Sequence, residues 1–253
     1  MFRPRIIPVL LLMNKGLVKT IKFKKPRYLG DPINAVRIFN ELNADELVFL
    51  DILASKESRP ISVEMVRNIG DEAFMPFAVG GGIRSIDVIR KLLSAGAEKV
   101  VINSYVFEDL DFILRASETF GSSTIIVSID LRKNILGKYG VYTYSGSKRI
   151  NIDPCEFVEV AESKGAGEIL VTSINQDGTM LGYDIKLIKS ISTSVNVPVI
   201  ACGGAGTFQN FNEVVKKGGA SAAAAGSLFV YHGDRKAFLI NYPEKKEFNK
   251  IFK

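Results

Sequence analysis

The sequence predicts an α/β protein: a closed (β/α)8 barrel with a two-fold internal repeat of half-barrels. The first observation behind this prediction is that eight short apolar runs, rich in Val and Ile, recur along the 253 residues. A helical pattern follows the runs, and apolar strands alternating with helices indicate a parallel sheet covered by helices. Eight such units favour closure into a barrel. The expected strands span residues 5–13, 46–51, 76–80, 99–103, 124–130, 168–173, 198–202 and 221–226.

The second observation is that the two halves of the chain resemble each other. The segment "ELVFLDI" recurs as "EILVTSI", and "PFAVGGGI" recurs as "PVIACGGAG", each 122 residues later. The opening "IIPVLL" recurs as "IIVSID" 119 residues later, and at that offset Leu11 corresponds to Asp130. A repeated four-strand unit predicts one domain over residues 1–253. Its parts are half-barrels at about 1–120 and 121–240, followed by a C-terminal tail at 241–253.

The third observation is that amphipathic segments with helix signals lie between the strands. One of them, 31–43, begins with Asp31 as an N-cap and Pro32 at the first helical position. Two more, 85–96 and 155–165, end at glycine, which is a helix stop. A fourth segment spans 207–219. These helices are expected to cover the outside of the barrel.

The opening stretch "RIIPVLLLMNKG" resembles the apolar run of a signal peptide, because Arg3 and Arg5 precede it. Pro8 interrupts the run, however, and no small-x-small cleavage site follows. No apolar run is long enough to cross a bilayer. The two cysteines, Cys155 and Cys202, have no metal or redox spacing, which favours a reducing cytoplasm. We therefore expect a cytoplasmic protein that is not bound to a membrane.

The net charge of +6 does not predict a nucleic-acid partner, because the Lys and Arg residues are spread over the chain. The densest cluster, "KTIKFKKPR" at 19–27, contains no recognisable nucleic-acid module and is expected to be an anion-handling or solvated loop. The single histidine, His232, excludes a multi-histidine metal site, and no carboxylate cluster replaces one. A nucleophile pair of Cys202 and His232 has little support, because Cys202 ends an apolar strand. No metal and no organic cofactor are expected.

The carboxyl ends of the strands carry glycine-rich turns. Active sites of such barrels lie at these ends, and glycine lets backbone N–H groups converge on an anion in front of a helix N-terminus. One set of turns lies in each half, which predicts two phosphate sites and an elongated ligand with a phosphate at each end. The alternative is that the glycines only make tight turns. The candidate phosphate-binding residues are Gly82, Asn103, Ser104, Asp177, Gly178, Gly204, Gly226 and Ser227.

With the repeat and the motifs "DELVFLDI", "VGGGI", "TYSG", "GAGEILVTSI", "QDGT" and "GGAG" in order, the chain resembles the cyclase subunit of imidazole glycerol phosphate synthase. The resemblance runs from about Arg5 to about Phe229. It implies a barrel that receives ammonia from a glutaminase subunit docked at its N-terminal face. It also implies that the barrel conducts ammonia through its core and uses it on a ribulosyl aminoimidazole carboxamide nucleotide.

The resemblance also implies an ammonia gate, which in the family is a ring of charged residues at the N-terminal ends of the strands. The matching residues here are Arg5, Glu46, Lys99 and Glu168. A paired ring is tolerable where unpaired charges would be costly to desolvate. The alternative is a set of capping salt bridges without a gating role. Asp45 and Glu98 lie next to the ring in sequence and are candidates to face the glutaminase.

The catalytic pair of the family is incomplete in this sequence. The family uses two aspartates, at the tops of strands 1 and 5, as general acid and base; Asp130 matches the second and Leu11 occupies the place of the first. Losing one member of such a pair typically costs about 10²–10⁴ in rate. A third family carboxylate is replaced by Asn175. Further positions near the family's substrate are matched by Lys19, Asp51 and Ser145.

Three functions remain open at this point, and with them the question of whether the chain is itself an enzyme. The first is a divergent cyclase-like subunit that passes ammonia to another acceptor. The opening "PVLLL…GLVKT" resembles a branch of the family associated with amidation of surface-polysaccharide sugars, which implies a sugar amidotransferase as a further partner. The second is an authentic cyclase of histidine biosynthesis. The third is a non-catalytic scaffold for a glutaminase.

Overall fold

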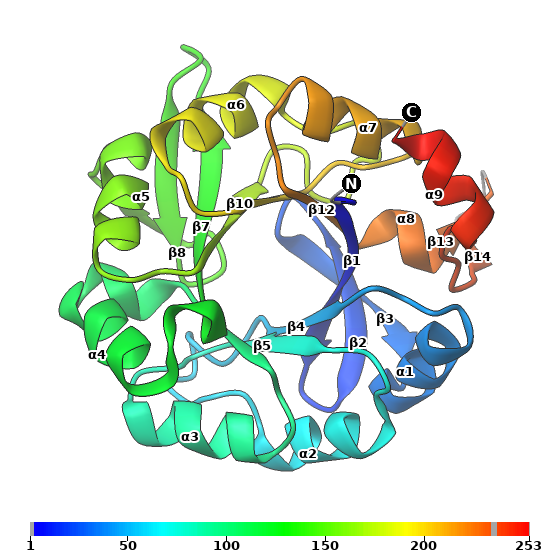
Figure 1. Cartoon of the computed structure of the whole chain (residues 1–253), viewed down its shortest axis with the longest axis horizontal. Coiled ribbons are helices and arrows are strands. Elements are labelled where there is room, and N and C mark those ends of the chain that lie inside the picture. The colour runs from blue at the N-terminus through cyan, green and yellow to red at the C-terminus, as the bar shows by residue number, and fades with distance from the viewer. Residues whose placement is uncertain (1–2, 234–236, 253) are drawn as a thin grey trace.

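Eight parallel strands close into a (β/α)8, or TIM, barrel, as expected. The structure, a computed structural model, describes residues 3–233 and 237–252. The barrel strands are β1 (Arg5–Met13), β4 (Leu47–Asp51), β5 (Phe77–Gly80), β6 (Lys99–Ile102), β7 (Ile125–Lys133), β10 (Glu168–Ser173), β11 (Val199–Cys202) and β12 (Ala222–Ala225). They pair in this order, and β12 returns to β1 to close the ring (Figure 1). The first half of β1 pairs with β12, from Arg5↔Ala222 onward, and its second half pairs with β4.

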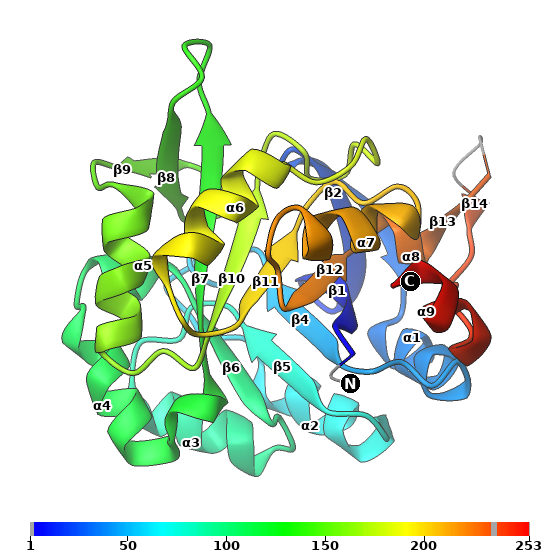
Figure 2. The ribbon, with the colours of Figure 1, turned by 45° about the horizontal axis from the view of Figure 1, so that its top comes forward.

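Helices surround this barrel and cover its outer face (Figure 2). At the start of α1, the Asp31 side chain accepts the N–H groups of Ile33 and Asn34, and Pro32 occupies the first turn, as predicted. At the start of α5, Asp153 and Pro154 make the same arrangement. The covering helices are α1 (Pro32–Glu41), α2 (Val63–Glu72), α3 (Ile86–Ser94), α4 (Asp111–Phe120), α5 (Pro154–Ser163), α6 (Ile185–Ser194), α7 (Gln209–Lys216) and α8 (Ser227–Val230).

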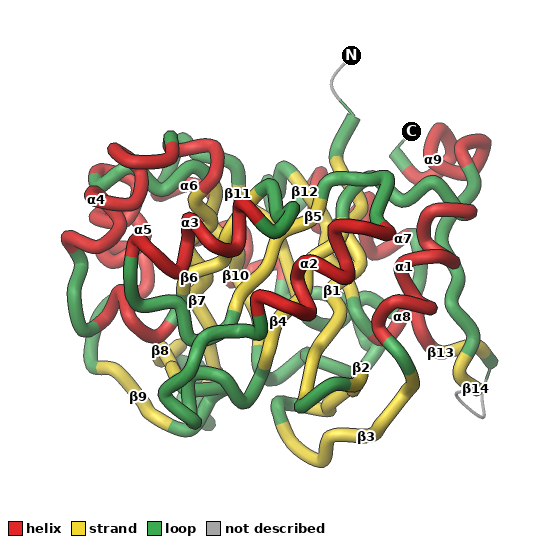
Figure 3. The backbone as a smooth tube through the Cα atoms, turned by 90° about the horizontal axis from the view of Figure 1, so that it is seen from below, coloured by secondary structure: helices red, strands yellow, loops and turns green. Residues whose placement is uncertain are grey.

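Each half of the chain opens in the same way. A nine-residue barrel strand, β1 or β7, leads into antiparallel strands, which lead into the helix capped by Asp and Pro. The antiparallel strands are β2 (Gly16–Ile21) and β3 (Lys24–Gly30) in the first half, and β8 (Tyr139–Thr143) and β9 (Lys148–Ile150) in the second. The expectation of a loop over 19–27 is therefore wrong, because most of that segment pairs as β2 and β3. Figure 3 shows these strands at the end of the barrel opposite the N-terminus.

Short elements complete the chain. They are the 3-10 turns η1 (Ser104–Phe107) and η2 (Ser122–Thr124), the strands β13 (Tyr231–His232) and β14 (Ala237–Phe238), and the helix α9 (Lys245–Ile251). The C-terminal tail is thus partly helical. Its Tyr242 hydroxyl donates to the Ile6 carbonyl at 2.8 Å and accepts the Asp45 N–H at 3.0 Å, so the tail is fastened to β1.

Side chains along the strands alternate between two cores, as the pleat of a strand requires. Outward-facing residues such as Ile6, Phe49 and Val127 pack against the helices. Inward-facing residues form a separate apolar column along the barrel axis: Ile7, Val9, Leu11, Val18, Val48, Ala78, Val101, Ile126, Leu170, Ile200, Cys202, Ala222 and Ala224. Charged residues lie at the amino ends of these strands, and polar residues lie at the carboxyl ends. Within the described ranges, no helix is both long and apolar enough to span a membrane.

Candidate functional site

A closed ring of charges lies at the amino ends of the barrel strands. The Arg5 guanidinium contacts Glu46 at 2.5 Å and Glu168 at 2.5 Å. The Lys99 ammonium lies 2.5 Å from Glu168 and 3.6 Å from Glu46, so the four predicted residues connect in a circle. Asp45 is turned away from this ring: it pairs with Arg3 and accepts the backbone N–H of Ile6. Glu98 is exposed.

The two acids of the ring are buried and its two bases are half-buried, so opposite charges stabilise one another there. Burial raises the pKa of Glu46, although the positive charges of Arg5 and Lys99 oppose this rise. Hydrogen bonds and charges from Glu168 and Glu46 raise the pKa of Arg5 despite its burial. The Glu46 Oε1 atom is buried and accepts no hydrogen bond from any described residue, although the Lys99 ammonium lies 3.6 Å from it. The ring therefore contains one acceptor that is ion-paired with Lys99 but lacks a hydrogen bond.

At the other end of the apolar column, the carboxyl ends of the strands enclose a cavity. Its empty volume is about 1180 Å³, including space open to solvent. The residues predicted for the ligand site and the catalytic pair all line it: Leu11, Lys19, Asp51, Gly82, Asn103, Ser104, Asp130, Ser145, Asp177, Gly178, Gly204, Gly226 and Ser227. Parallel strands end at one edge, which is why residues far apart in sequence meet here.

Asp130 is a buried carboxylate on the wall of this cavity. Only 9% of it is exposed, and Asn103 donates a hydrogen bond to its Oδ2 at 3.0 Å. Burial, reinforced by the nearby charge of Asp177, raises the pKa of Asp130 to about 7. A carboxyl group with this pKa can both give and take a proton near neutral pH.

Leu11 makes the facing wall of the cavity apolar. It pairs in register with Val18 on one side and Leu50 on the other, and all three pack in the inner core. Its side chain is 8% exposed. The cavity therefore has one wall with an ionisable group, on β7, and one wall without, on β1.

The turns after β5 and β6 form the first predicted phosphate site. Gly82 has a φ of +61°, and a Cβ there would lie 1.9 Å from the carbonyl oxygen of Arg59. Only glycine fits this turn. Ser104 Oγ accepts the backbone N–H of Tyr144 at 3.0 Å. The Asn103 Oδ1 atom is buried and without a hydrogen-bond partner among the described residues, so it can still accept a hydrogen bond from a ligand.

The turns after β10, β11 and β12 form the second predicted site. Here the Lys19 ammonium reaches in from β2 and lies 2.9 Å from Asp177, as a buried ion pair. Gly178 and Gly204 have positive φ values of 74° and 116°. The Ser227 hydroxyl is buried and unpartnered within the described part of the chain. A free hydroxyl beside glycine turns is suited to an anionic ligand.

Comparison with known proteins shows the family of the chain. Residues 5–236 match the family described as histidine biosynthesis protein. The chain belongs to this family. It is 46% identical over 244 residues, 96% of its length and 97% of the relative's, to a Pseudomonas aeruginosa protein provisionally named imidazole glycerol phosphate synthase subunit hisF2.

Two further relatives in the histidine biosynthesis family carry similar names. A Vibrio vulnificus protein provisionally named imidazole glycerol phosphate synthase subunit hisF3 is 43% identical, over 98% of this chain and 95% of its own. The imidazole glycerol phosphate synthase subunit HisF of Streptococcus sanguinis is 42% identical, over 91% of this chain and 92% of its own. Both cover almost the whole barrel.

Some cavity residues of this family member were not anticipated from the sequence. Arg84 follows the Gly82 turn, lines the cavity, and donates from Nη2 to the Tyr144 hydroxyl at 3.1 Å. Tyr105 also lines the cavity, and the Arg84 guanidinium lies 5.9 Å from the centre of its ring. The "GGGIR" stretch offered a signal for Arg84, but its partner Tyr144 is 60 residues away.

Two of the predicted ligand residues, Asp51 and Ser145, form hydrogen bonds within the protein. The Asp51 carboxylate binds Arg59 at 2.6 Å and the N–H groups of Leu53 and Ala54. Ser145 donates to the carbonyl of Ile52 at 2.6 Å. These contacts hold the turns that border the cavity, so both residues shape its rim whether or not they touch a ligand.

Asn175 lies outside the cavity lining. Its amide accepts the Lys133 N–H at 2.7 Å and donates to the Lys133 carbonyl at 3.3 Å. An ionised aspartate has no donor for the second bond. The amide at this position therefore ties the end of β7 to the loop after β10.

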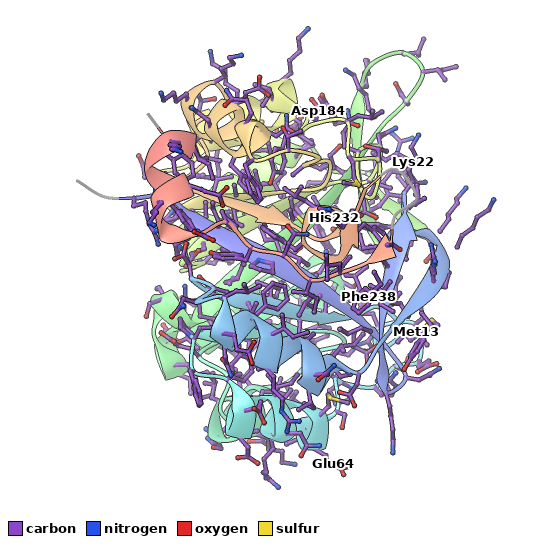
Figure 4. All side chains as sticks on the ribbon, turned by 90° about the vertical axis from the view of Figure 1, so that its right-hand side faces the viewer. Met13, Lys22, Glu64, Asp184, His232 and Phe238 are labelled. Carbon is purple, nitrogen blue, oxygen red and sulfur yellow. The ribbon has the colours of Figure 1, made fainter. Side chains whose placement is uncertain are left out.

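Cys202 and His232 do not meet. Cys202 lines the cavity, and burial raises the pKa of its thiol to about 12, so the thiolate is scarce at neutral pH. His232 is exposed on β13 at the outer side of the barrel (Figure 4) and does not line the cavity. In the part of the chain that the structure describes, no group of three or more His, Cys, Asp or Glu side chains could hold a metal ion.

Proposed function

We propose that this chain is the cyclase-like subunit of a glutamine amidotransferase complex. It receives ammonia from a glutaminase subunit at its N-terminal face and delivers it, through the barrel, for amidation of a sugar in surface-polysaccharide biosynthesis. The observation that carries the proposal is the pairing of an intact charge ring with an apolar Leu11 wall opposite Asp130. The entrance for ammonia is kept, while one half of the acid–base pair is absent.

The charge ring and the apolar column support the ammonia route. The Glu46 Oε1 atom faces Lys99 at 3.6 Å without a hydrogen bond, so it can accept one from a small donor such as ammonia. Beyond it, the inward side chains Ile7, Ala78 and Ala222 offer no hydrogen-bonding group. An ammonium ion would lose its hydration there at high cost, so only neutral ammonia could proceed. Opening the ring requires a movement of Arg5 or Lys99, which docking of the glutaminase would supply.

The glycine turns at the mouth support a phosphorylated ligand. Two sets of turns, around Gly82 and around Gly204, face one cavity. Each set includes a buried polar atom with an open hydrogen-bonding position, Asn103 Oδ1 and Ser227 Oγ. The Leu11 wall between them is suited to a ligand whose middle part needs no second acid.

An authentic cyclase of histidine biosynthesis is the second candidate. One observation favours it: Asp130 has a pKa of about 7, suited to proton transfer, and Asn103 orients it. The Streptococcus sanguinis relative also bears the name of this enzyme's subunit. On this alternative, a group other than Leu11 would have to supply the second proton-transfer step.

The deciding experiment supplies the purified barrel with an ammonium salt and the ribulosyl aminoimidazole carboxamide nucleotide, and follows formation of imidazole glycerol phosphate. Free ammonia removes the need for a glutaminase, so the assay isolates the chemistry of the barrel. The Streptococcus sanguinis relative serves as the matched positive control. Turnover below about 1% of the control supports our proposal, since an absent acid or base costs about 10²–10⁴. Turnover equal to the control overturns it in favour of the second candidate.

A further inference from the structure

Lys and Arg residues occur along the whole chain, but the excess of positive over negative charge lies in two corresponding segments. Residues 16–30 and 131–150 each contain five Lys or Arg and no Asp or Glu. The whole chain has 33 Lys and Arg against 27 Asp and Glu, so outside these segments the count is 23 against 27. The net charge of +6 therefore comes entirely from the two segments, which we name the basic hairpins.

The basic hairpins occupy one face of the molecule. They contain β2 and β3 after β1, and the end of β7 with β8 and β9. Both follow the carboxyl ends of barrel strands, so they flank the mouth of the cavity and lie opposite the charge ring (Figure 3). Figure 4 shows Lys22 and Met13 at this same end.

Within the described residues, most of these cations form no ion pair, although Arg27, Lys133 and Lys148 lie over tyrosine rings. Lys19 is buried against Asp177, and Arg132 is half-buried over the ring of Tyr142. The other eight are exposed, and within the described residues none of them pairs with a carboxylate: Lys22, Lys24, Lys25, Arg27, Lys133, Lys138, Lys148 and Arg149. Unpaired charges of one sign on two adjacent hairpins repel one another, so their grouping destabilises the isolated barrel.

Large apolar side chains are exposed on the same segments. Ile135 and Leu136, at the tip of the β7–β8 hairpin, are 102% and 79% exposed. Ile21 and Tyr28 on the β2–β3 hairpin are 51% and 69% exposed. Exposed aliphatic and aromatic groups beside unpaired cations offer a protein partner both apolar area to bury and charge to pair with.

We propose that the basic hairpins dock an acidic protein, the enzyme that consumes the ammonia, over the mouth of the barrel. This inference rests on the proposed function, because the mouth is the exit of the ammonia route. Ammonia released into water would be diluted and protonated, so an acceptor enzyme must cover the exit. An acidic surface is complementary to eight unpaired cations, and such complementarity speeds encounter and fixes orientation.

The test measures amidation by a purified N-acetyl sugar amidotransferase, together with the barrel and its glutaminase, under two nitrogen sources. Glutamine requires transfer through the barrel, whereas ammonium salt bypasses it. Two barrel variants remove docking charge: Lys24→Glu with Lys25→Glu, and Lys148→Glu with Arg149→Glu. The matched control, Arg67→Glu with Lys189→Glu, makes the same change of charge at exposed positions on α2 and α6.

We expect each docking variant to lower glutamine-driven amidation by about tenfold or more, and to weaken barrel–amidotransferase binding in a salt-dependent way. Ammonium-driven amidation and glutaminase turnover should not change, and the control should match the wild type. Changing Ile135 and Leu136 to Ser should weaken binding without altering its salt dependence.

Equal loss in the control, or full activity in both docking variants, overturns the docking proposal. So does binding of the basic hairpins to vesicles containing phosphatidylserine, or to duplex DNA, in place of the amidotransferase. Failure of the proposed function looks different. In that case wild-type barrel and glutaminase give no glutamine-driven amidation although ammonium supports it, whatever the charge of the hairpins.

Discussion

The Asn103 side chain donates a hydrogen bond of 3.0 Å to Asp130, and the bond points at a carboxylate that is only 9% exposed. The donor stabilises the ionised form of Asp130, yet burial outweighs it and the pKa rises to about 7. Asn103 therefore orients the carboxyl group without making it a permanent anion. The remaining Asn103 oxygen, which is buried and unbonded among the described residues, stays available to a ligand.

This balance predicts a pH-dependent stability. The pKa of Asp130 in the folded state is raised from 3.8 to about 7. The contribution of this carboxyl group to the free energy of unfolding is therefore fully present below about pH 4 and is lost as pH rises through 7. Because asparagine does not ionise, the Asp130→Asn variant does not lose this stability as pH rises. We expect the variant to match the wild type at pH 4 and to be more stable at pH 8.5, by at most about 4 kcal/mol at 1.36 kcal/mol per pH unit. Urea unfolding at both pH values measures the difference, and an identical difference at each would contradict the assignment.

Restoring an acid at Leu11 tests whether one group alone is missing. Leu11→Asp places a carboxylate on β1 across the cavity from Asp130, and we expect detectable ammonia-dependent cyclase turnover. A gain of about 10²-fold or more over the wild type would be in the range of a general acid or base. Leu11→Asn is the matched control, since asparagine is polar and has the size of aspartate but cannot transfer a proton. Equal activity in the two variants, or none in either, would show that the cavity has diverged beyond this position.

Removing one member of the charge ring by mutation should lower the free energy of unfolding. Arg5→Met leaves Glu46 and Glu168 with Lys99 as their one cation in the ring. Removing one partner from a buried ion network destabilises by about 3–5 kcal/mol, and we expect a value toward the lower end because a quarter of the Arg5 side chain is exposed. Unfolding by guanidinium chloride measures this loss. A second change, Glu46→Gln, should recover part of it; no recovery would mean that Arg5 acts through packing and not through charge.

Arg84 should contribute to anion binding at the first glycine turn. Its guanidinium faces the cavity from the residue next but one to Gly82, and the Tyr144 hydroxyl holds it. We expect Arg84→Gln to weaken binding of inorganic phosphate about tenfold, which corresponds to the loss of one charge-assisted hydrogen bond. Isothermal titration with phosphate, with Arg67→Gln on α2 as the control, measures the effect. If Arg84→Gln binds as tightly as this control, Arg84 serves only to position the Tyr144 loop.

The barrel could be predicted from the sequence because its strands are buried on both faces. Two expected spans, 5–13 and 168–173, coincide with β1 and β10, and the others differ from the observed strands by at most three residues at an end. The helix starting at Pro32 was predictable because Asp31 and Pro32 form a strong local signal. Local sequence patterns are therefore enough to predict the fold class and the positions of the barrel strands.

The basic hairpins could not be predicted in the same way. Two of their strands, β3 and β9, carry successive charged residues, so neither a two-residue period nor an apolar run marks these strands. Lys22, Phe23 and Lys25 have positive φ angles although none is glycine, so the turn has no glycine signal. Pairing with a long neighbouring strand decides their structure, and that information is not local.

The candidate site was partly predictable for a geometric reason. Residues at the ends of parallel strands meet at one edge, so a list of strand-end residues became the lining of one cavity. Arg84 was missed because its position depends on Tyr144, which belongs to the other half of the chain. The ion pair of Lys19 with Asp177 likewise joins residues 158 apart, which no local pattern reveals.

Strand β1 has two parallel partners in succession, β12 for Arg5 to Pro8 and β4 for Val9 to Leu12. A chain made from its N-terminus must therefore keep the first half of β1 as an unpaired edge until the last barrel strand is synthesised. Such long-range pairing is slow, and an exposed edge invites association with other chains. The charge ring also forms late in folding, because Arg5 contacts Glu168 only when both halves of the barrel are in place. A chain that lacks its second half thus has no complete charge ring, and a glutaminase that recognises the ring would not bind such a chain.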